Sequence, residues 1–190
     1  MNLIQLILLP FSLIYGLIAS IRNKFFDWNL LPSESFDIPI ISVGNLSCGG
    51  TGKTPHVEYL IRLLKSDYKI ATLSRGYKRN TSGFLLCNNE STHKDIGDEP
   101  LQYCMKFKDI QVSVDEDRRN GIKLLQKHFP EIQTILLDDA FQHRYVKPGM
   151  QILTTDFHNL YMEDYPLPSG TLMEFRAGAK RADIIIVTKC

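Results

Sequence analysis

The stretch from Ser42 to Leu60, SVGNLSCGGTGKTPHVEYL, contains the residue types best suited to binding phosphate. Gly52, Lys53 and Thr54 match the end of the phosphate-loop pattern G-x-x-x-x-G-K-[ST]. The first glycine of the pattern is replaced by serine, Ser47. Glycines let the backbone approach closely, so several N–H groups can point at one phosphate. In such a loop the lysine contacts the β- and γ-phosphates and the threonine hydroxyl binds Mg²⁺. The stretch therefore predicts a nucleotide site, with a helix-capping glycine turn as the alternative.

A second cluster, TILLDDAFQHR, places two aspartates at the end of an apolar run that reads as a strand. This is the Walker B arrangement, in which an aspartate assists in holding Mg²⁺. Asp138 and Asp139 are adjacent and would repel one another unless a cation or a donor shares them, so we expect a metal there. Gln142 and His143 follow closely enough to face the same cleft, although His143 alone would be equally well explained as a structural imidazole.

The elements that must position these residues alternate between short apolar runs and helix-like segments. Apolar, strand-like runs occur at residues 40–43, 69–77 (where the run leads into a loop), 83–87, 110–114, 132–139, 150–156 and 182–189. Between the first two runs, a helical segment places Val57, Leu60, Ile61 and Leu64 on one face. Continuous apolar strands that alternate with helices indicate a mainly parallel α/β sheet flanked by helices, as in P-loop NTPases.

The N-terminal segment from Met1 to Ser20 has no charged side chain, and Arg22, Lys24 and Trp28 follow it. Such a run is long enough to cross a bilayer or to lie embedded in one face of it. It lacks the leading positive charge and the small-residue cleavage site of a secretory signal. We therefore predict a membrane anchor over residues 1–28, with the remaining chain on the cytoplasmic side. A buried core helix is the alternative.

The amino-acid composition argues against several other classes of protein. An apolar fraction of 44% supports a packed core, and the net charge of +1 with scattered basic residues argues against nucleic-acid binding. The cysteines form no C-x-x-C pair, so we expect reduced thiols in a cytosolic protein rather than a disulfide framework or a zinc site. These cysteines are Cys48, Cys87, Cys104 and Cys190.

Five motifs together resemble one family. SVGNLSCGGTGKTP, LSRGYKR, GDEP, LLDDAFQHR and PSGTLMEFR occur in the order, and at about the spacing, of tetraacyldisaccharide 4′-kinase, the lipid A kinase of Gram-negative bacteria. The resemblance covers essentially the whole chain. It implies an ATP- and Mg²⁺-dependent kinase that phosphorylates the 4′-hydroxyl of a tetraacyldisaccharide 1-phosphate, giving lipid IVA at the cytoplasmic face of the inner membrane. The implied partners are the lipid A precursor and inner-membrane lipids; no protein partner is inferred.

The resemblance also assigns roles to residues. The family's loop resembles G-N-x-x-x-G-G-T-G-K-T-P, so a serine at position 47 is expected. Asp98 in GDEP matches the family's proposed general base, although a helix N-cap is the alternative. The implied ATP-binding residues are Ser47, Cys48, Gly49, Gly50, Thr51, Gly52, Lys53 and Thr54. The implied catalytic cluster is Lys53, Asp98, Asp138, Asp139 and His143, and the implied metal ligands are Thr54, Asp139 and Glu174.

Four further positions match residues near the substrate or the phosphates, with ordinary surface charge as the alternative. They are Arg75, Tyr77, Arg118 and Gln142. The chain departs from the family at Met173, where arginine is usual, and at Phe175, where proline is usual. The role of the missing arginine either passes to Arg176 or is lost.

The family continues beyond the last residue of this chain into a second domain. We accordingly expect residues 29–190 to form a P-loop kinase core that is cut before that domain. By itself this core is expected to bind nucleotide without phosphorylating lipid. A rival interpretation is a membrane-attached P-loop NTPase, similar to a GTPase switch, because VTK at residues 187–189 faintly matches a guanine-reading motif.

Overall fold

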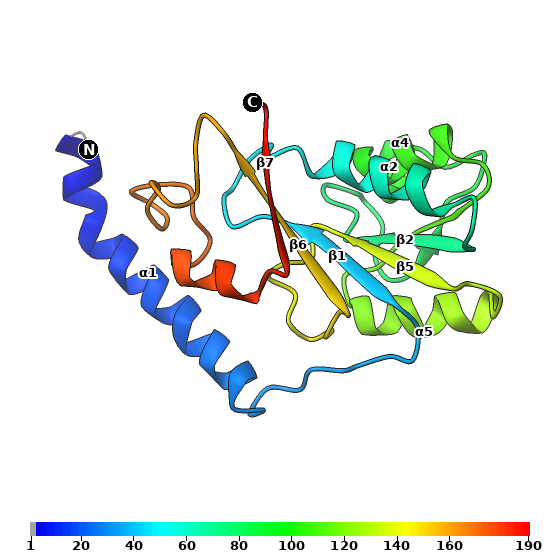
Figure 1. Ribbon diagram of the computed structural model, residues 1–190, viewed down its shortest axis with the longest axis horizontal. Coiled ribbons are helices and arrows are strands. Elements are labelled where there is room, and N and C mark those ends of the chain that lie inside the picture. The colour runs from blue at the N-terminus through cyan, green and yellow to red at the C-terminus, as the bar shows by residue number, and fades with distance from the viewer. Residues whose placement is uncertain (1–2) are drawn as a thin grey trace.

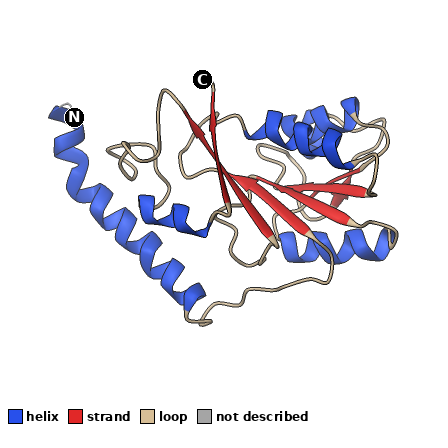
Figure 2. Cartoon of the chain, viewed as in Figure 1, coloured by secondary structure: helices blue, strands red, loops and turns tan. Residues whose placement is uncertain are grey.

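The sheet that carries the candidate site is visible in the computed structural model, which describes residues 3–190 (Figures 1 and 2). Within those residues seven strands pair in the order β3-β4-β2-β5-β1-β6-β7. All neighbouring pairs are parallel except β3 with β4. The strands are β1 Ile40–Gly44, β2 Ile70–Ser74, β3 Leu85–Leu86, β4 Gln111–Val114, β5 Thr134–Asp138, β6 Met150–Asp156 and β7 Ile184–Thr188.

Helices cover both faces of this sheet, which confirms the predicted α/β class. The helices are α1 Leu3–Asp27, α2 Lys53–Leu64, α3 His93–Ile96, α4 Asp98–Lys106, α5 Arg118–His128 and the 3-10 helix η1 Arg176–Arg181. Figure 1 shows α2 and α4 on one face and α5 on the other. The predicted face of α2 is the one that packs on the sheet, since Val57 and Ile61 are buried and Leu60 and Leu64 partly so.

The strand order places the two predicted motifs side by side. β1 pairs with β5, and Val43 lies opposite Asp138 in the register. The chain therefore leaves both strands at the same edge of the sheet. In parallel α/β sheets this carboxyl edge is where ligands bind. The loop after β1 is the phosphate-loop candidate, and the turn after β5 carries Asp139.

Helix α1 runs alongside the segment of residues 164–181 rather than over the sheet (Figure 1). The Ser169 N–H donates to the Ser12 hydroxyl at 2.8 Å. A Cβ at Gly16 would lie 2.5 Å from the Phe175 ring, so glycine permits this close approach. Most of the helix's apolar side chains are exposed. The helix is therefore fixed along one side only, which does not fit the alternative of a buried core helix. It continues through Pro10 and ends at Asp27.

The expectation of four reduced thiols is wrong for one pair. Cys87 and Cys104 form a disulfide with a Cα–Cα distance of 6.4 Å, whereas Cys48 and Cys190 are free and exposed. Cys87 directly follows β3 and Cys104 lies on α4. Packing of α4 beside this edge of the sheet brings the two together, and a separation of 17 residues in sequence does not reveal that proximity.

Candidate active site

The loop after β1 has the backbone geometry of an anion site. Gly49 and Gly52 have φ values of 126° and 77°, a region that strains other residues. Gly52 precedes α2 and has no side chain to cap it, so the first N–H groups of the helix remain available to a ligand. The side-chain amide of Asn45 donates to the carbonyl oxygens of Ser47 and Gly49 at 2.6 and 3.4 Å and so fixes the curve of the loop.

The absence of the pattern's first glycine has a structural reason. Ser47 forms an isolated antiparallel bridge with Leu172, so its backbone is extended and needs no glycine. On either side, the Cys48 N–H donates to the Thr171 carbonyl at 2.7 Å and the Met173 N–H donates to the Leu46 carbonyl at 2.8 Å. The segment of residues 171–173 thus supports this side of the loop.

Thr51, another of the predicted ATP-binding residues, has a buried side chain that holds the loop to the sheet. Its hydroxyl shares a 2.9 Å hydrogen bond with the hydroxyl of Thr154 on β6. Its carbonyl accepts a hydrogen bond from the hydroxyl of Thr188 on β7 at 3.1 Å. The side chain of Thr51 therefore supports the loop, and the exposed Cys48, Gly49 and Gly50 form its outer rim.

Lys53 and the paired aspartates meet at the carboxyl edge of the sheet. The Lys53 ammonium Nζ lies 3.4 Å from Oδ1 of Asp139, whose side chain is 55% exposed. Asp138 is only 5% exposed. Burial, followed by the charge of Asp139, raises the pKa of Asp138 to about 6. The two carboxylates are therefore chemically distinct. Their oxygens, with the Thr54 hydroxyl nearby at the start of α2, are the hard ligands that suit Mg²⁺.

Tyr103 on α4 is a site residue that the sequence reasoning missed. Its phenol donates to Oδ2 of Asp138 at 3.1 Å, and its ring is fully buried. The hydroxyl also interacts with Thr54. Burial and the negative charge of Asp138 raise the pKa of Tyr103 well above its usual value, so the phenol stays protonated and acts as a donor. The only signal in the sequence was a tyrosine five residues after Asp98.

A cavity of about 390 Å³ opens beside Asp139 and gathers many of the predicted residues. Its lining residues are Arg22, Arg75, Glu116, Arg118, Asp139, Gln142, His143 and Met173. The Gln142 side-chain amide donates to the Asn45 carbonyl at 2.6 Å, which ties the turn after β5 to the phosphate loop. Arg22 and Glu116 were not predicted. They reach the cavity from α1 and from the residues just before α5.

Burial shifts the pKa values of both Arg118 and His143. Arg118 is the first residue of α5 and is only 2% exposed. Burial and the charge of Arg75 lower the pKa of Arg118 to about 10, so it remains a cation at neutral pH. Burial and the charge of Arg118 lower the pKa of His143 to about 4, so the imidazole is neutral. Its Nε2 is buried without a hydrogen-bond partner in the described part of the chain.

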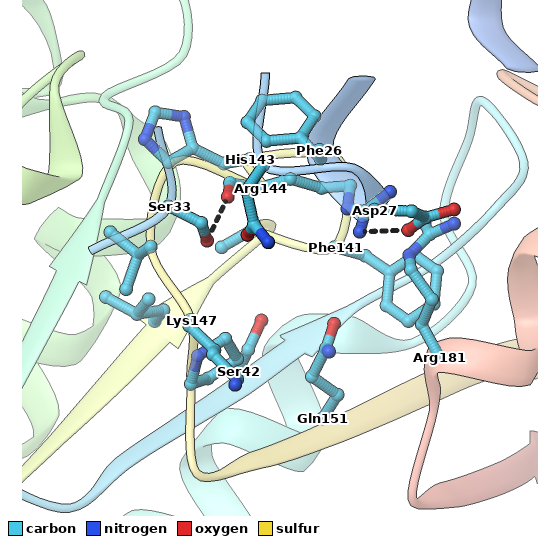
Figure 3. A pocket seen from close by; sticks show the side chains of 15 residues that line it. Phe26, Asp27, Ser33, Ser42, Phe141, His143, Arg144, Lys147, Gln151 and Arg181 are labelled. Carbon is cyan, nitrogen blue, oxygen red and sulfur yellow. Dashed lines mark hydrogen bonds and ion pairs between the residues drawn. The ribbon is translucent and has the colours of Figure 1, made fainter. Parts of the chain in front are cut away.

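His143 also lines a second cavity, between the end of α1 and the sheet (Figure 3). On one side of it, Arg144 donates to Oδ1 of Asp27 at 2.8 Å and to the Asn23 carbonyl at 2.7 Å. These bonds fix the last turn of α1 against the turn after β5. The end of the apolar helix is therefore attached to the same turn that carries Asp139, Gln142 and His143.

Asp98 and Tyr77 lie next to this region but are not among the residues that line either cavity. Asp98 is exposed and is the first residue of α4. The cap of α4 is Gly97, so the alternative role of Asp98 as an N-cap is wrong. A Cβ on Gly97 would lie 3.0 Å from the Tyr77 carbonyl oxygen. This close approach packs the loop of residues 75–78 against the start of α4.

Glu174, predicted as a metal ligand, is engaged elsewhere in this structure. Its two oxygens accept hydrogen bonds from Arg181 at 2.6 and 2.8 Å, and Oε2 also accepts one from Asn23 at 2.6 Å. Within residues 3–190, no three His, Cys, Asp or Glu side chains gather in a way that could hold a metal. A metal role for Glu174 therefore stays a prediction, and its visible role is to join α1 to η1.

Arg176 does not replace the arginine that is usual at position 173. Its Nε donates to the Asp164 carbonyl at 2.9 Å, and its guanidinium lies over the Tyr165 ring. Met173 lines the cavity beside Asp139, whereas Arg176 does not. Of the two alternatives drawn from the sequence, transfer of that role to Arg176 finds no support.

Comparison with known proteins identifies close relatives. A family model described as Tetraacyldisaccharide-1-P 4'-kinase (LpxK) matches residues 4–190. The tetraacyldisaccharide 4'-kinase of Flavobacterium johnsoniae is 57% identical over 190 residues, which are 100% of this chain and 56% of that protein. The Parabacteroides distasonis protein of the same name is 58% identical over 188 residues, 97% of this chain and 50% of that protein. The chain thus spans about half the length of these relatives.

A solved structure agrees with the fold. The crystal structure of LpxK from Aquifex aeolicus in complex with ATP superposes with a TM-score of 0.91 at 36% identity. The match covers 98% of this chain and 59% of the Aquifex chain. The two folds therefore agree over almost the whole of this chain, which includes the sheet, the helices on its two faces and the apolar N-terminal helix.

Proposed function

The chain belongs to the tetraacyldisaccharide-1-P 4'-kinase family, as its five motifs suggested, and we propose that it forms the ATP-binding part of a lipid A kinase. The proposed reaction transfers the γ-phosphate of ATP to the 4′-hydroxyl of a tetraacyldisaccharide 1-phosphate. The observation that carries this proposal is the pairing of Lys53 with Asp139 beside a cavity rich in arginine. One side of this pair faces the phosphate loop and the other faces space for an acceptor.

The nucleotide side follows from the loop geometry. N–H groups of the loop and of the first turn of α2 would bind the phosphates, with Lys53 over the β- and γ-phosphates. Thr54 and Asp139 would hold Mg²⁺, and Tyr103 orients Asp138 behind them. When bound, the metal neutralises the charge that develops on the transferred phosphoryl group. Ion-pairing to Lys53 keeps Asp139 in place before nucleotide binds.

The acceptor side requires a base for the incoming hydroxyl. Asp98 is exposed at the first position of α4 and is free of any ion pair among the described residues. Its carboxylate would accept the hydroxyl proton while the acceptor oxygen bonds to phosphorus and the bond to ADP breaks. α4 also carries Tyr103, so one helix places both the base and the donor that holds Asp138. His143 is neutral and adds no competing charge.

The apolar helix α1 would bring this site to the membrane. Within the described residues, α1 is long and apolar enough to cross a membrane. Only 11% of its most apolar stretch is buried against the rest of the protein. We place it in the plane of the cytoplasmic face of the inner membrane, in contact with inner-membrane lipids. Ser12, Gly16 and Asn23 attach it to residues 169–175 along its length. A full crossing would draw that polar segment into hydrocarbon, where unsatisfied backbone groups are costly.

On this proposal residues 29–190 are the kinase core and residues 1–28 its membrane anchor. No observation favours the GTPase-like alternative. Lys189, the lysine of VTK, donates to the Asp156 carboxylate at 2.6 Å. The deciding experiment follows labelled γ-phosphate from ATP or GTP in the whole protein, with and without tetraacyldisaccharide 1-phosphate. We expect label on the lipid, with ATP preferred. Hydrolysis of GTP that does not depend on the lipid would overturn the proposal.

A further inference from the structure

The threonine of the VTK motif at residues 187–189 lies against the phosphate loop. Thr188 is the last residue of β7 and is 7% exposed. Its single hydroxyl hydrogen is shared between the carbonyl oxygens of Thr51 in the loop and Thr155 on β6, each 3.1 Å from Oγ1. A Cβ at Gly52 would lie 3.3 Å from Cγ2 of Thr188, so the side chain also packs close to the loop's last glycine. Thr188 therefore meets the loop at the peptide that joins Thr51 to Gly52.

A second set of hydrogen bonds holds the side chain of Thr51. The hydroxyl of Thr154 on β6 donates to the Gly44 carbonyl at 3.2 Å. Because a hydroxyl has one hydrogen, Thr51 is the donor in the 2.9 Å bond between the Thr51 and Thr154 hydroxyls. Thr51 is thereby attached to β6 through its side chain and to β7 through its carbonyl. These two attachments fix the orientation of the peptide between Thr51 and Gly52.

The orientation of this peptide decides where the Gly52 N–H points. The peptide is trans, and in a planar trans peptide the C=O and the N–H point in opposite directions. Because the Thr51 carbonyl points at Thr188, the Gly52 N–H points away from β7. In the part of the chain that the structure describes, this N–H donates to no acceptor. It is therefore free for a ligand, as are the first N–H groups of α2 that follow it.

We propose that Thr188 is a positioning residue for the nucleotide, because its hydroxyl holds the Thr51 carbonyl so that the Gly52 N–H points at the phosphates. This inference rests on the proposed function, which assigns the loop's anion to ATP. A donor that is already oriented binds phosphate without the cost of ordering it first. Without the hydroxyl, the Thr51 carbonyl loses a hydrogen bond from β7, and the peptide is free to rotate toward another donor.

This role accounts for the VTK motif without a guanine base. The Thr188 hydroxyl is engaged by two carbonyls of the protein, and Lys189 donates to the Asp156 carboxylate at 2.6 Å. β7 pairs with β6 along its whole length, from Ile184 to Thr188. The sheet thus holds the hydroxyl in place, and the motif acts on the phosphate loop rather than on a base.

The test is calorimetry of Mg·ADP binding to the whole protein and to its Thr188→Val variant, since valine keeps the shape of threonine and lacks the hydroxyl. We expect binding about tenfold weaker, as the loss of an oriented hydrogen-bond donor would give. Thr188→Ala removes the hydroxyl without adding bulk beside Gly52 and should lose as much affinity. Thr188→Ser restores the hydroxyl and should recover most of it. Thermal unfolding checks that each variant is folded.

Thr72→Val is the matched control. Thr72 is a fully buried threonine of β2, and its hydroxyl has no partner among the described residues. Its Mg·ADP affinity should equal that of the parent. Turnover gives a second readout, because a positioning role predicts that the KM for ATP rises about tenfold in Thr188→Val while the KM for the lipid stays unchanged.

Parent-like binding of Mg·ADP by the valine and alanine variants would overturn the role of Thr188. So would a serine variant that binds no better than valine, or an equal loss in Thr72→Val. The binding readout is separate from phosphate transfer. Hydroxyl-dependent binding in a protein that does not phosphorylate the lipid would sink the proposed function and leave this inference standing. An active lipid kinase whose Mg·ADP affinity does not depend on Thr188 would do the reverse.

Discussion

The phenol of Tyr103 donates a 3.1 Å hydrogen bond to Oδ2 of Asp138, and both side chains are buried. This bond joins α4 to the end of β5. Because α4 begins at Asp98, the proposed base and the aspartates at the phosphate site belong to one connected unit. A shift of α4 would move the base and remove a donor from Asp138 at the same time.

Removing this hydroxyl should impair both stability and turnover. We predict that Tyr103→Phe lowers the free energy of unfolding by about 1–3 kcal/mol, since a buried carboxylate loses its donor. Turnover should fall, and the Mg²⁺ concentration required for half-maximal activity should rise, because Asp138 and Thr54 both lose their contact with the hydroxyl. Urea unfolding and Mg²⁺ titration of activity measure these effects. Tyr59→Phe, at an exposed tyrosine of α2, is the control and should change neither.

The pH dependence of stability should show two opposing contributions. Asp138 has a folded pKa of about 6, above its unfolded value, so its contribution to stability falls as pH rises from about 4 to 6. His143 has a folded pKa of about 4, below its unfolded value, so its contribution rises over about pH 4 to 6.5. Each shift corresponds to about 3 kcal/mol, so without Mg²⁺ the two contributions offset one another in part.

The Asp138→Asn substitution should remove the opposing contribution of Asp138 and reveal the effect of His143 on the pH dependence of stability. We predict that this variant gains stability as pH rises from 4 to 6.5, and that it gains more than the parent chain does in that window. Chemical denaturation at a series of pH values, in the absence of Mg²⁺, measures both curves. Parallel curves for the two proteins would show that Asp138 does not titrate as its buried position implies.

Glu174 provides a test between a structural and a metal-binding carboxylate. We predict that Glu174→Gln lowers the free energy of unfolding by about 3 kcal/mol, because it leaves the Arg181 guanidinium with no carboxylate partner. A structural role also predicts that the Mg²⁺ dependence of activity stays as in the parent. Thermal unfolding and Mg²⁺ titration separate the two. A normal melting temperature with a raised Mg²⁺ requirement would instead establish Glu174 as a metal ligand.

Membrane binding should depend on the exposed face of α1. We predict that Leu17→Arg lowers partition onto vesicles of phosphatidylethanolamine and phosphatidylglycerol by about tenfold or more, since it places a charge on an embedded apolar face. Tyr59→Arg is a matched control, because Leu17 and Tyr59 are 57% and 60% exposed. Co-sedimentation measures both variants. If the parent chain stays in the supernatant with these vesicles, α1 is not an anchor.

The parts of the site that follow one another in sequence could be predicted. The glycine loop, Lys53 and Thr54 occupy one strand–loop–helix unit, and Asp138 and Asp139 end one apolar strand. The types of these residues and their order in the sequence are enough to indicate a phosphate and metal site. The observed strand order then makes the two strands parallel neighbours, so their ends meet at one edge of the sheet.

The parts created by long-range packing could not be predicted. Tyr103 reaches Asp138 across 35 residues, and Arg22 reaches the cavity from a helix that the sequence indicated only as an anchor. Glu174 matched a motif, yet its partners Asn23 and Arg181 lie 151 and 7 residues away. A local pattern reports residue types and spacing, whereas these contacts depend on how separate elements pack.

The account rests most heavily on Lys53 and Asp139 acting as one phosphate and metal unit. The most direct test measures transfer of labelled γ-phosphate to tetraacyldisaccharide 1-phosphate by the whole protein and by its Lys53→Ala and Asp139→Asn variants. Lys123→Ala is the control, since Lys123 pairs with Glu34 on the surface. We predict a fall of at least about a hundredfold for either site variant, since phosphoryl transfer depends on charge neutralisation and positioning. The control should be unchanged. More than about a tenth of the parent rate in either site variant, with the fold intact, would contradict the assignment of this site.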